Sequence, residues 1–193
     1  MAELSVAAVQ MDLAWENRAE NHRRARDWAE RAVAGGSQLV ILPEMFATGF
    51  SMDPRVTAEA PDGPTPTFLR QLARGLSVAV IGGYVRAAGE GRALNAALAV
   101  GADGRDLAEY HTTHLVGILG EHEAHRAGEG PRPFALAGAG VACFVCYDLR
   151  FPELFRLVAR DTALVVVIAS WPEARQAHWD ALLVARAIEN QQF

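Results

Sequence analysis

The sequence contains no lysine, and all 18 of its basic residues are arginine. It also has only two cysteines, too few for a disulfide framework. No apolar run approaches the length of a membrane-spanning helix. The start of the chain shows no basic segment followed by an apolar one, so we expect no signal peptide. Together these absences favour a cytoplasmic protein.

Acidic residues outnumber arginines by 23 to 18, so the formal net charge is −5. This balance argues against non-specific nucleic-acid binding and against attachment to an acidic membrane surface. The length of 193 residues is enough for one domain with a real core. Apolar residues make up 51% and charged residues 21%, which is ordinary for a globular protein. We therefore expect a single domain over residues 1–193.

Apolar runs separated by turn residues predict alternating strands and helices. The expected strands are 4–10, 39–42, 78–85, 93–100, 107–110, 134–136, 141–145 and 163–169. The expected helices are 17–34, 65–73 with Thr65 as its N-cap, 150–159 and 173–192. Alternation at both ends indicates a layered α/β fold, and a hairpin turn at 102–105 indicates mixed sheets. Segment 111–133 lacks periodicity and is expected to be a long functional loop.

Cys146 follows the apolar strand 141–145 and precedes the helix expected from Arg150. A helix N-terminus offers free N–H groups and partial positive charge, so a thiol there is expected to ionise more easily and act as a nucleophile. The next backbone N–H, on Tyr147, is placed to face a developing oxyanion. The simpler alternative is a buried structural cysteine, since free cysteine is among the most buried residue types.

The spacing of Cys143 and Cys146 also matches a redox pair or half of a zinc site. Residues three apart on a strand point to opposite faces, so the two thiols should diverge. A zinc site would need two more ligands at matching spacing, whereas the histidines are scattered. We therefore expect Cys143 to lie in the core.

Glu44 stands just after the apolar strand 39–42. A carboxylate at a strand end is usually solvated. In apolar surroundings, however, its pKa rises and it can act as a general base, which Cys146 would need for acyl transfer. Two such groups at the ends of two strands are typical of an α/β active site.

Four segments in chain order resemble the nitrilase, or carbon–nitrogen hydrolase, superfamily: 42–46 (LPEMF), 110–115 (YHTTHL), 146–152 (CYDLRFP) and 185–191 (ARAIENQ). Segments 44–50 and 120–123, with the pairs 171–172 and 178–179, look most like the omega-amidase branch, which deamidates 2-oxoglutaramate and related 2-oxo acid amides. The resemblance implies an αββα sandwich and a homodimer formed through its helical faces. It also implies a small-molecule amide as substrate and an activity that needs no cofactor or metal.

The resemblance also assigns roles to individual residues. Glu44 matches the general base, Cys146 the nucleophile, and Glu121 a second glutamate that orients the site, with Glu123 as the alternative register. The Tyr147 N–H would form part of the oxyanion hole. Phe50 and Trp171 are the expected substrate contacts.

The chain departs from the family pattern at its catalytic lysine, whose position is occupied by Thr112. A hydroxyl can donate one hydrogen bond but brings no charge. Arg126 or Arg150 are the candidates to replace that charge, although arginine and lysine are not interchangeable. For Arg150 the stronger expectation is a pairing with a carboxylate that holds the turn.

The second departure is length, because family members continue with further strands beyond the segment that matches 185–191. We therefore expect the C-terminal strands of one sheet to be missing from these 193 residues. Two functions remain open from the sequence. One is a cysteine-dependent amidase, and the other is a catalytically impaired relative that binds a small carboxylate or amide.

Overall fold

The computed structural model describes residues 3–89, 91–117 and 120–193. Its strands are β1 (Val6–Ala8), β2 (Leu39–Ile41), β3 (Ala58–Glu59), β4 (Ala79–Ala87), β5 (Ala93–Val100), β6 (Asp106–His111), β7 (Phe134–Leu136), β8 (Ala139–Val145) and β9 (Leu164–Ile168). Its helices are α1 (Arg18–Ala34), α2 (Pro54–Thr57), α3 (Pro64–Leu76), α4 (Glu121–Ala124), α5 (Pro152–Val158) and α6 (Gln176–Asn190), with 3₁₀ turns η2 (Cys146–Arg150) and η3 (Glu173–Arg175).

The described strands form two sheets. The larger has the order β1-β2-β4-β5-β6, with β3 paired to β4, and the smaller has the order β7-β8-β9. Within the larger sheet β1, β2 and β4 run parallel, whereas β4, β5 and β6 are antiparallel. The smaller sheet is also mixed, because β7 is antiparallel and β9 parallel to β8. The expected mixed sheets and the hairpin between β5 and β6 are therefore confirmed.

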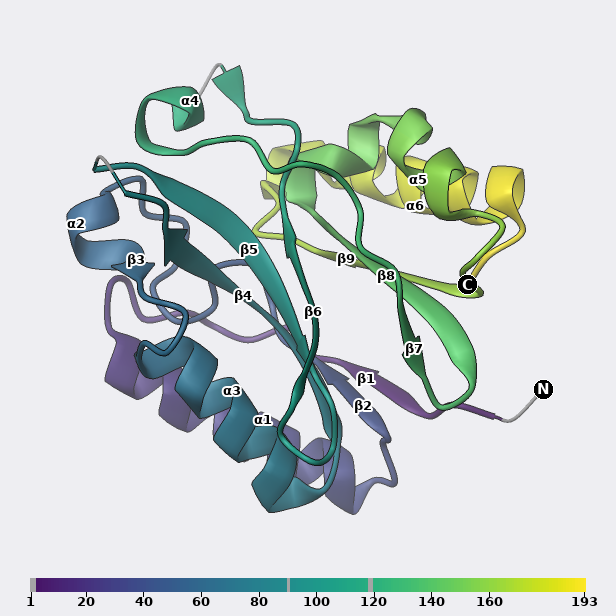
Figure 1. The fold of residues 1–193 in the computed structure, drawn as a ribbon, viewed down its shortest axis with the longest axis horizontal. Helices are drawn as coiled ribbons and strands as arrows, with labels where there is room; N and C mark the ends of the chain where they lie inside the picture. Colours follow the sequence, from purple (N-terminus) through teal and green to yellow (C-terminus); the bar gives the residue numbers. More distant parts are fainter. Residues whose placement is uncertain (1–2, 90, 118–119) are drawn as a thin grey trace.

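The two sheets are stacked and covered by helices on their outer faces. Successive side chains of β2 point to opposite faces of the larger sheet. Leu39 belongs to the core between the sheets, and Val40 belongs to the core under α1 and α3. Phe155 of α5 packs on Phe144 of β8 from the other side, with ring centroids 4.5 Å apart. Figure 1 shows α1 and α3 on one side of the sheets and α5 and α6 on the other. This arrangement is the αββα sandwich expected from the sequence.

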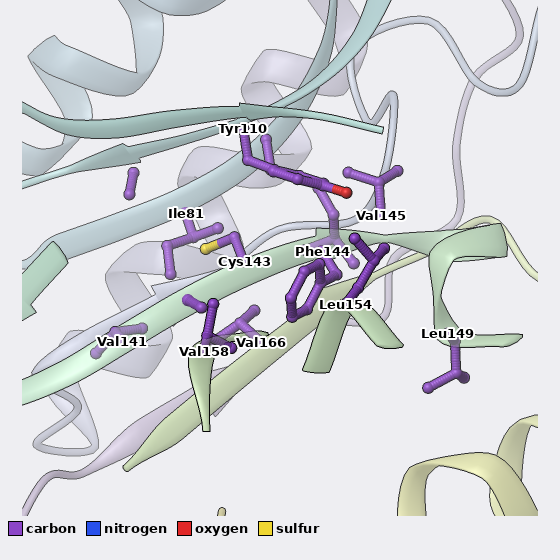
Figure 2. Close-up of a cluster of buried hydrophobic side chains, with 14 of the residues drawn as sticks. Ile81, Tyr110, Val141, Cys143, Phe144, Val145, Leu149, Leu154, Val158 and Val166 are labelled. Atoms are coloured by element: carbon purple, nitrogen blue, oxygen red, sulfur yellow. The ribbon is translucent and has the colours of Figure 1, made fainter. Parts of the chain in front are cut away.

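Cys143 lies in the core between the sheets. Figure 2 shows its sulfur pointing toward Ile81 of the larger sheet. Both cysteines are free, and burial raises the pKa of the Cys143 thiol to about 12. The core role expected for this residue is confirmed, and no redox pair exists between the two thiols.

Some local expectations differ from the structure. Thr65 is not the cap of α3: Pro64 takes the first helical position after Gly63, because proline has no N–H to leave unpaired there. The helix after Cys146 begins later than expected, since a 3₁₀ turn fills 146–150 and α5 starts at Pro152. The short α2, β3 and α4 carry too few residues to show periodicity. No helix in the described part of the chain has the length and apolarity needed to span a bilayer.

Candidate active site

Glu44 sits in a tight turn that follows β2. The next residue, Met45, has a left-handed backbone with φ 48°, which costs free energy in a residue other than glycine. The turn also presses on Gly83 of β4, where an added Cβ would lie 2.6 Å from the Glu44 Cα. The Gly83 N–H donates to the Pro43 carbonyl at 3.1 Å. Packing against β4 therefore fixes the direction of the Glu44 side chain.

The Glu44 carboxylate is buried and held from both sheets. Its Oε1 accepts from Asn95 Nδ2 of β5 at 2.7 Å, and its Oε2 accepts from the Ser170 N–H, just after β9, at 2.6 Å. Burial is the largest influence on its pKa and raises it from 4.5 to about 7, despite these hydrogen bonds. A base with a pKa near neutrality can both accept and return a proton.

Cys146 occupies the first position of η2, directly after β8, and its backbone is left-handed with φ 45°. Its thiol lies beside the Glu44 carboxylate, because each group shifts the pKa of the other. Strained backbone of this kind is concentrated at functional sites. The expected proximity of Glu44 and Cys146 is thus present in the structure.

The expectation that the Cys146 thiol ionises easily is wrong for this structure. Burial and the neighbouring Glu44 charge raise its pKa well above the ordinary range. A five-residue 3₁₀ turn supplies little positive potential to offset them. The thiol therefore keeps its proton at rest, and nucleophilic attack requires Glu44 to remove it.

Glu121 begins α4 and is also buried. Its Oε2 accepts from the Val116 N–H at 2.7 Å, and its Oε1 lies 3.4 Å from Asn95 Nδ2. Burial raises its pKa. Glu123 is exposed on the same short helix, so Glu121 is the glutamate that reaches the site. Asn95 thus bridges Glu44 and Glu121.

Thr112 lies just beyond β6, and its side chain is turned toward Asp148. Its hydroxyl donates to Asp148 Oδ2 at 2.9 Å. Asp148 is fully buried in η2 and also accepts from the Tyr110 hydroxyl at 2.8 Å and the His114 N–H at 3.0 Å. This carboxylate ties the end of β6 to the turn that carries Cys146. The Thr112 hydroxyl is engaged in that connection, not directed at Glu44.

Neither candidate arginine supplies charge to the two glutamates. Arg126 is exposed. The Arg150 guanidinium lies over the rings of Trp171 and Tyr147, 4.9 and 5.8 Å from their centroids, so the expected pairing with a carboxylate is wrong. Among the described residues, no arginine forms an ion pair with Glu44 or Glu121. Nor does that part of the chain place three or more His, Cys, Asp or Glu side chains to hold a metal ion.

The expected substrate contacts, Phe50 and Trp171, lie in different surroundings. Phe50 packs against Met45, Val85 and Ala93. Trp171 borders a cavity of about 950 Å³ between the ends of β1, β2 and β9, which Ser170 also lines. Neither Glu44 nor Cys146 lines this cavity, which therefore lies beside these two residues. The roles of Phe50, Trp171 and the Tyr147 N–H in substrate binding stay predictions.

The sequence reasoning missed three groups that organise the site. Asn95 could have been found, because it is the only polar side chain in the strand ALNAALAV. Asp148 stood inside a recognised motif but had no assigned role. Ser170 contributes a backbone N–H, for which a sequence carries no signal.

Comparison with known proteins places this arrangement in a family. The sequence profile of the carbon–nitrogen hydrolases matches residues 5–193. This chain belongs to the carbon–nitrogen hydrolase family. It is similar to an amidase of Nesterenkonia from the nitrilase superfamily, which has been solved in several forms, one of them with acrylamide added at its active-site cysteine.

Curated relatives include a 2-oxoglutaramate amidase of Bacillus subtilis, 30% identical over 98% of this chain and 73% of its own length. An omega-amidase of Yersinia enterocolitica is 36% identical over 100% of this chain and 73% of its own length. The "hydrolase in agr operon" of Staphylococcus aureus is 35% identical, with coverage of 98% and 74%.

Solved structures agree with the fold of this carbon–nitrogen hydrolase. A superfamily member from Xanthomonas campestris with an arsenic adduct in its active site matches with a TM-score of 0.92 and 36% identity, over 100% of this chain and 74% of the other. An amidase of Nesterenkonia, solved after acrylamide had added to its active-site cysteine, matches with a TM-score of 0.91 and 29% identity, over 98% and 76%.

Proposed function

We propose that this carbon–nitrogen hydrolase cleaves a small amide of the omega-amidase type, converting a 2-oxo acid amide to the acid and ammonia. The observation that carries the proposal is the buried, adjacent pair of Glu44 and Cys146, which both sheets position. A protonated thiol beside a carboxylate with a pKa of about 7 is a nucleophile with its base in place.

In the first half of the proposed reaction, Glu44 accepts the thiol proton while the Cys146 sulfur attacks the amide carbonyl carbon. The resulting oxyanion faces the Tyr147 N–H, and Glu44 returns the proton to the leaving nitrogen. The C–N bond breaks, ammonia departs, and a thioester remains. Water then attacks the thioester, passing a proton to Glu44, and the C–S bond breaks to release the acid and restore the thiol.

A second candidate is a catalytically impaired protein that binds a small carboxylate or amide. It is favoured by Thr112, because this residue is neutral and its hydroxyl is already bonded to Asp148. Loss of one oxyanion donor typically costs about 10²–10³ in rate. The described residues show no other cation paired with Glu44 or Glu121.

Thr112→Lys distinguishes the two candidates. The assay is acid formation from 2-oxoglutaramate and a few aliphatic amides by both proteins. If the amidase machinery is otherwise intact, lysine should raise kcat by about 10²-fold, because a charged donor acts on charge that develops in the transition state. Thr112→Met controls for side-chain length without charge, and Cys146→Ala in the Thr112→Lys background should abolish turnover.

The outcomes separate cleanly. Wild-type turnover at ordinary enzyme rates, about 1–10³ s⁻¹, would show that the lysine is dispensable and would eliminate the impaired-protein alternative. A folded Thr112→Lys protein that hydrolyses none of the amides would contradict the proposed amidase function.

A homodimer formed through the α5 and α6 faces is part of the proposal. It is supported by large apolar side chains exposed on these helices: Leu157, Val184 and Ile188. Ile188→Glu should yield a monomer in sedimentation velocity if this face is the interface. The cytoplasmic location inferred from the sequence stays a prediction.

A further inference from the structure

The carboxylates of Glu44 and Glu121 are both buried, and within the described residues the amide of Asn95 is the one partner that they share. A negative charge on one carboxyl group makes ionisation of the other less favourable, and the Glu121 charge is one cause of the raised pKa of Glu44. In the described residues no arginine approaches either carboxylate. A buried acidic pair is more stable with a cation, because opposite charges attract strongly where water is excluded.

Asn95 supplies a second and independent observation. It is only 2% exposed, and its Oδ1 has no hydrogen-bond partner in the described structure. The same amide contacts both carboxylates through Nδ2, and Oδ1 is bonded to the same carbon as Nδ2, so the unpaired acceptor lies next to this cluster. A buried acceptor that is left unpaired destabilises the folded state, so a donor at this point would be favoured.

The acceptors also have free capacity. Glu44 Oε1 and Glu121 Oε1 are joined to Asn95 by one donor each, whereas a carboxylate oxygen can accept two. A primary ammonium group carries three donors and no acceptor, which matches three oxygens that can each accept a further hydrogen bond. A neutral donor would satisfy Asn95 but would bring no positive charge to the two carboxyl groups.

We propose that the cluster of Glu44, Glu121 and Asn95 binds a small primary ammonium ion, and that this ion supplies in trans the charge that Thr112 does not. The inference rests on the proposed amidase function and adds an activating ligand to it. Ammonia is the leaving group of that reaction and is protonated near neutrality. The product would therefore activate the enzyme, and progress curves should accelerate with time.

The test uses methylammonium chloride, with sodium chloride and potassium chloride at the same ionic strength as controls. Acid formation is measured, so that added amine does not interfere. Wild-type turnover should rise by about tenfold or more with methylammonium relative to either metal chloride. Thr112→Lys carries its own ammonium group and should show no further rise. Equal effects of all three salts, or an undiminished rise in Thr112→Lys, would overturn the proposal.

Thermal denaturation gives a readout that does not depend on turnover. Methylammonium should raise the Tm of the wild type above its value in sodium chloride, because the ligand binds the folded state. The increase should disappear in Thr112→Lys and in Glu121→Gln. Activity of Thr112→Lys without any methylammonium response in the wild type would refute the ammonium site and leave the amidase function intact. A Tm response without turnover in either protein would support the ammonium site and refute the amidase function.

Discussion

Replacing Glu44 by glutamine should change how stability depends on pH. The folded-state pKa of Glu44 is raised from 4.5 to about 7, chiefly by burial. Below pH 4.5 the residue is protonated in both the folded and the unfolded protein. As pH rises from 4.5 to 7, the unfolded chain releases this proton while the folded protein keeps it. Wild-type stability therefore falls across this window, and the effect is complete above pH 7.

The magnitude follows from the difference between the two pKa values. One pKa unit corresponds to about 1.4 kcal/mol, so Glu44 lowers the free energy of unfolding by about 3 kcal/mol across the window. Glutamine cannot ionise, so Glu44→Gln lacks this contribution. The stability of the variant minus that of the wild type should increase by about 3 kcal/mol as pH rises from 4.5 to 7.

Urea denaturation followed by circular dichroism at a series of pH values measures this difference, and titrating groups that do not interact with Glu44 cancel between the two proteins. Glu123→Gln removes a carboxylate from the exposed face of α4 and serves as the control. A difference that stays flat or falls with pH would refute the reasoning. It would mean that the hydrogen bonds from Asn95 and Ser170 outweigh burial, and that Glu44 is already ionised in acid.

Three further expectations concern the supports of the site. Cys146 should be alkylated by iodoacetamide before Cys143, because only Cys146 contacts a base; equal labelling in peptide maps would contradict this. Gly83→Ala should lower the Tm markedly and reduce turnover, since the new Cβ would lie 2.6 Å from the Glu44 backbone. The control is Gly75→Ala on the exposed side of α3, which should leave the free energy of unfolding unchanged or raise it by up to about 1 kcal/mol. Asp148→Ala should lower the free energy of unfolding, measured by urea denaturation, by about 3 kcal/mol or more, because several buried donors lose their acceptor. A decrease below about 1 kcal/mol would show that these donors find other partners.

The sequence by itself determined where most elements lie and which faces they bury. The apolar strand at 93–100 and the alternation of Leu39 and Val40 follow directly from side-chain periodicity, which is a local property. The turn after 141–145 and the strand end before Glu44 were likewise visible, so both candidate groups were found. The recognised segments then indicated the layered sandwich that these elements form.

Only the tertiary structure decided how the site is connected. Asn95 and Ser170 reach Glu44 across 51 and 126 residues of sequence, and no local pattern specifies such approaches. The engagement of the Thr112 hydroxyl by Asp148 likewise depends on β6 meeting the Cys146 turn in space.

The protonation of Glu44 and Cys146 was also decided by the tertiary structure. The sequence places Cys146 before a helix and suggests an ionised thiol, but the folded chain buries it against Glu44 and raises the pKa of both groups. The physical reason is that a pKa depends on how much water and how many charges surround the group. Those surroundings come from β5, β8 and the segment after β9, which only the packed sheets bring together.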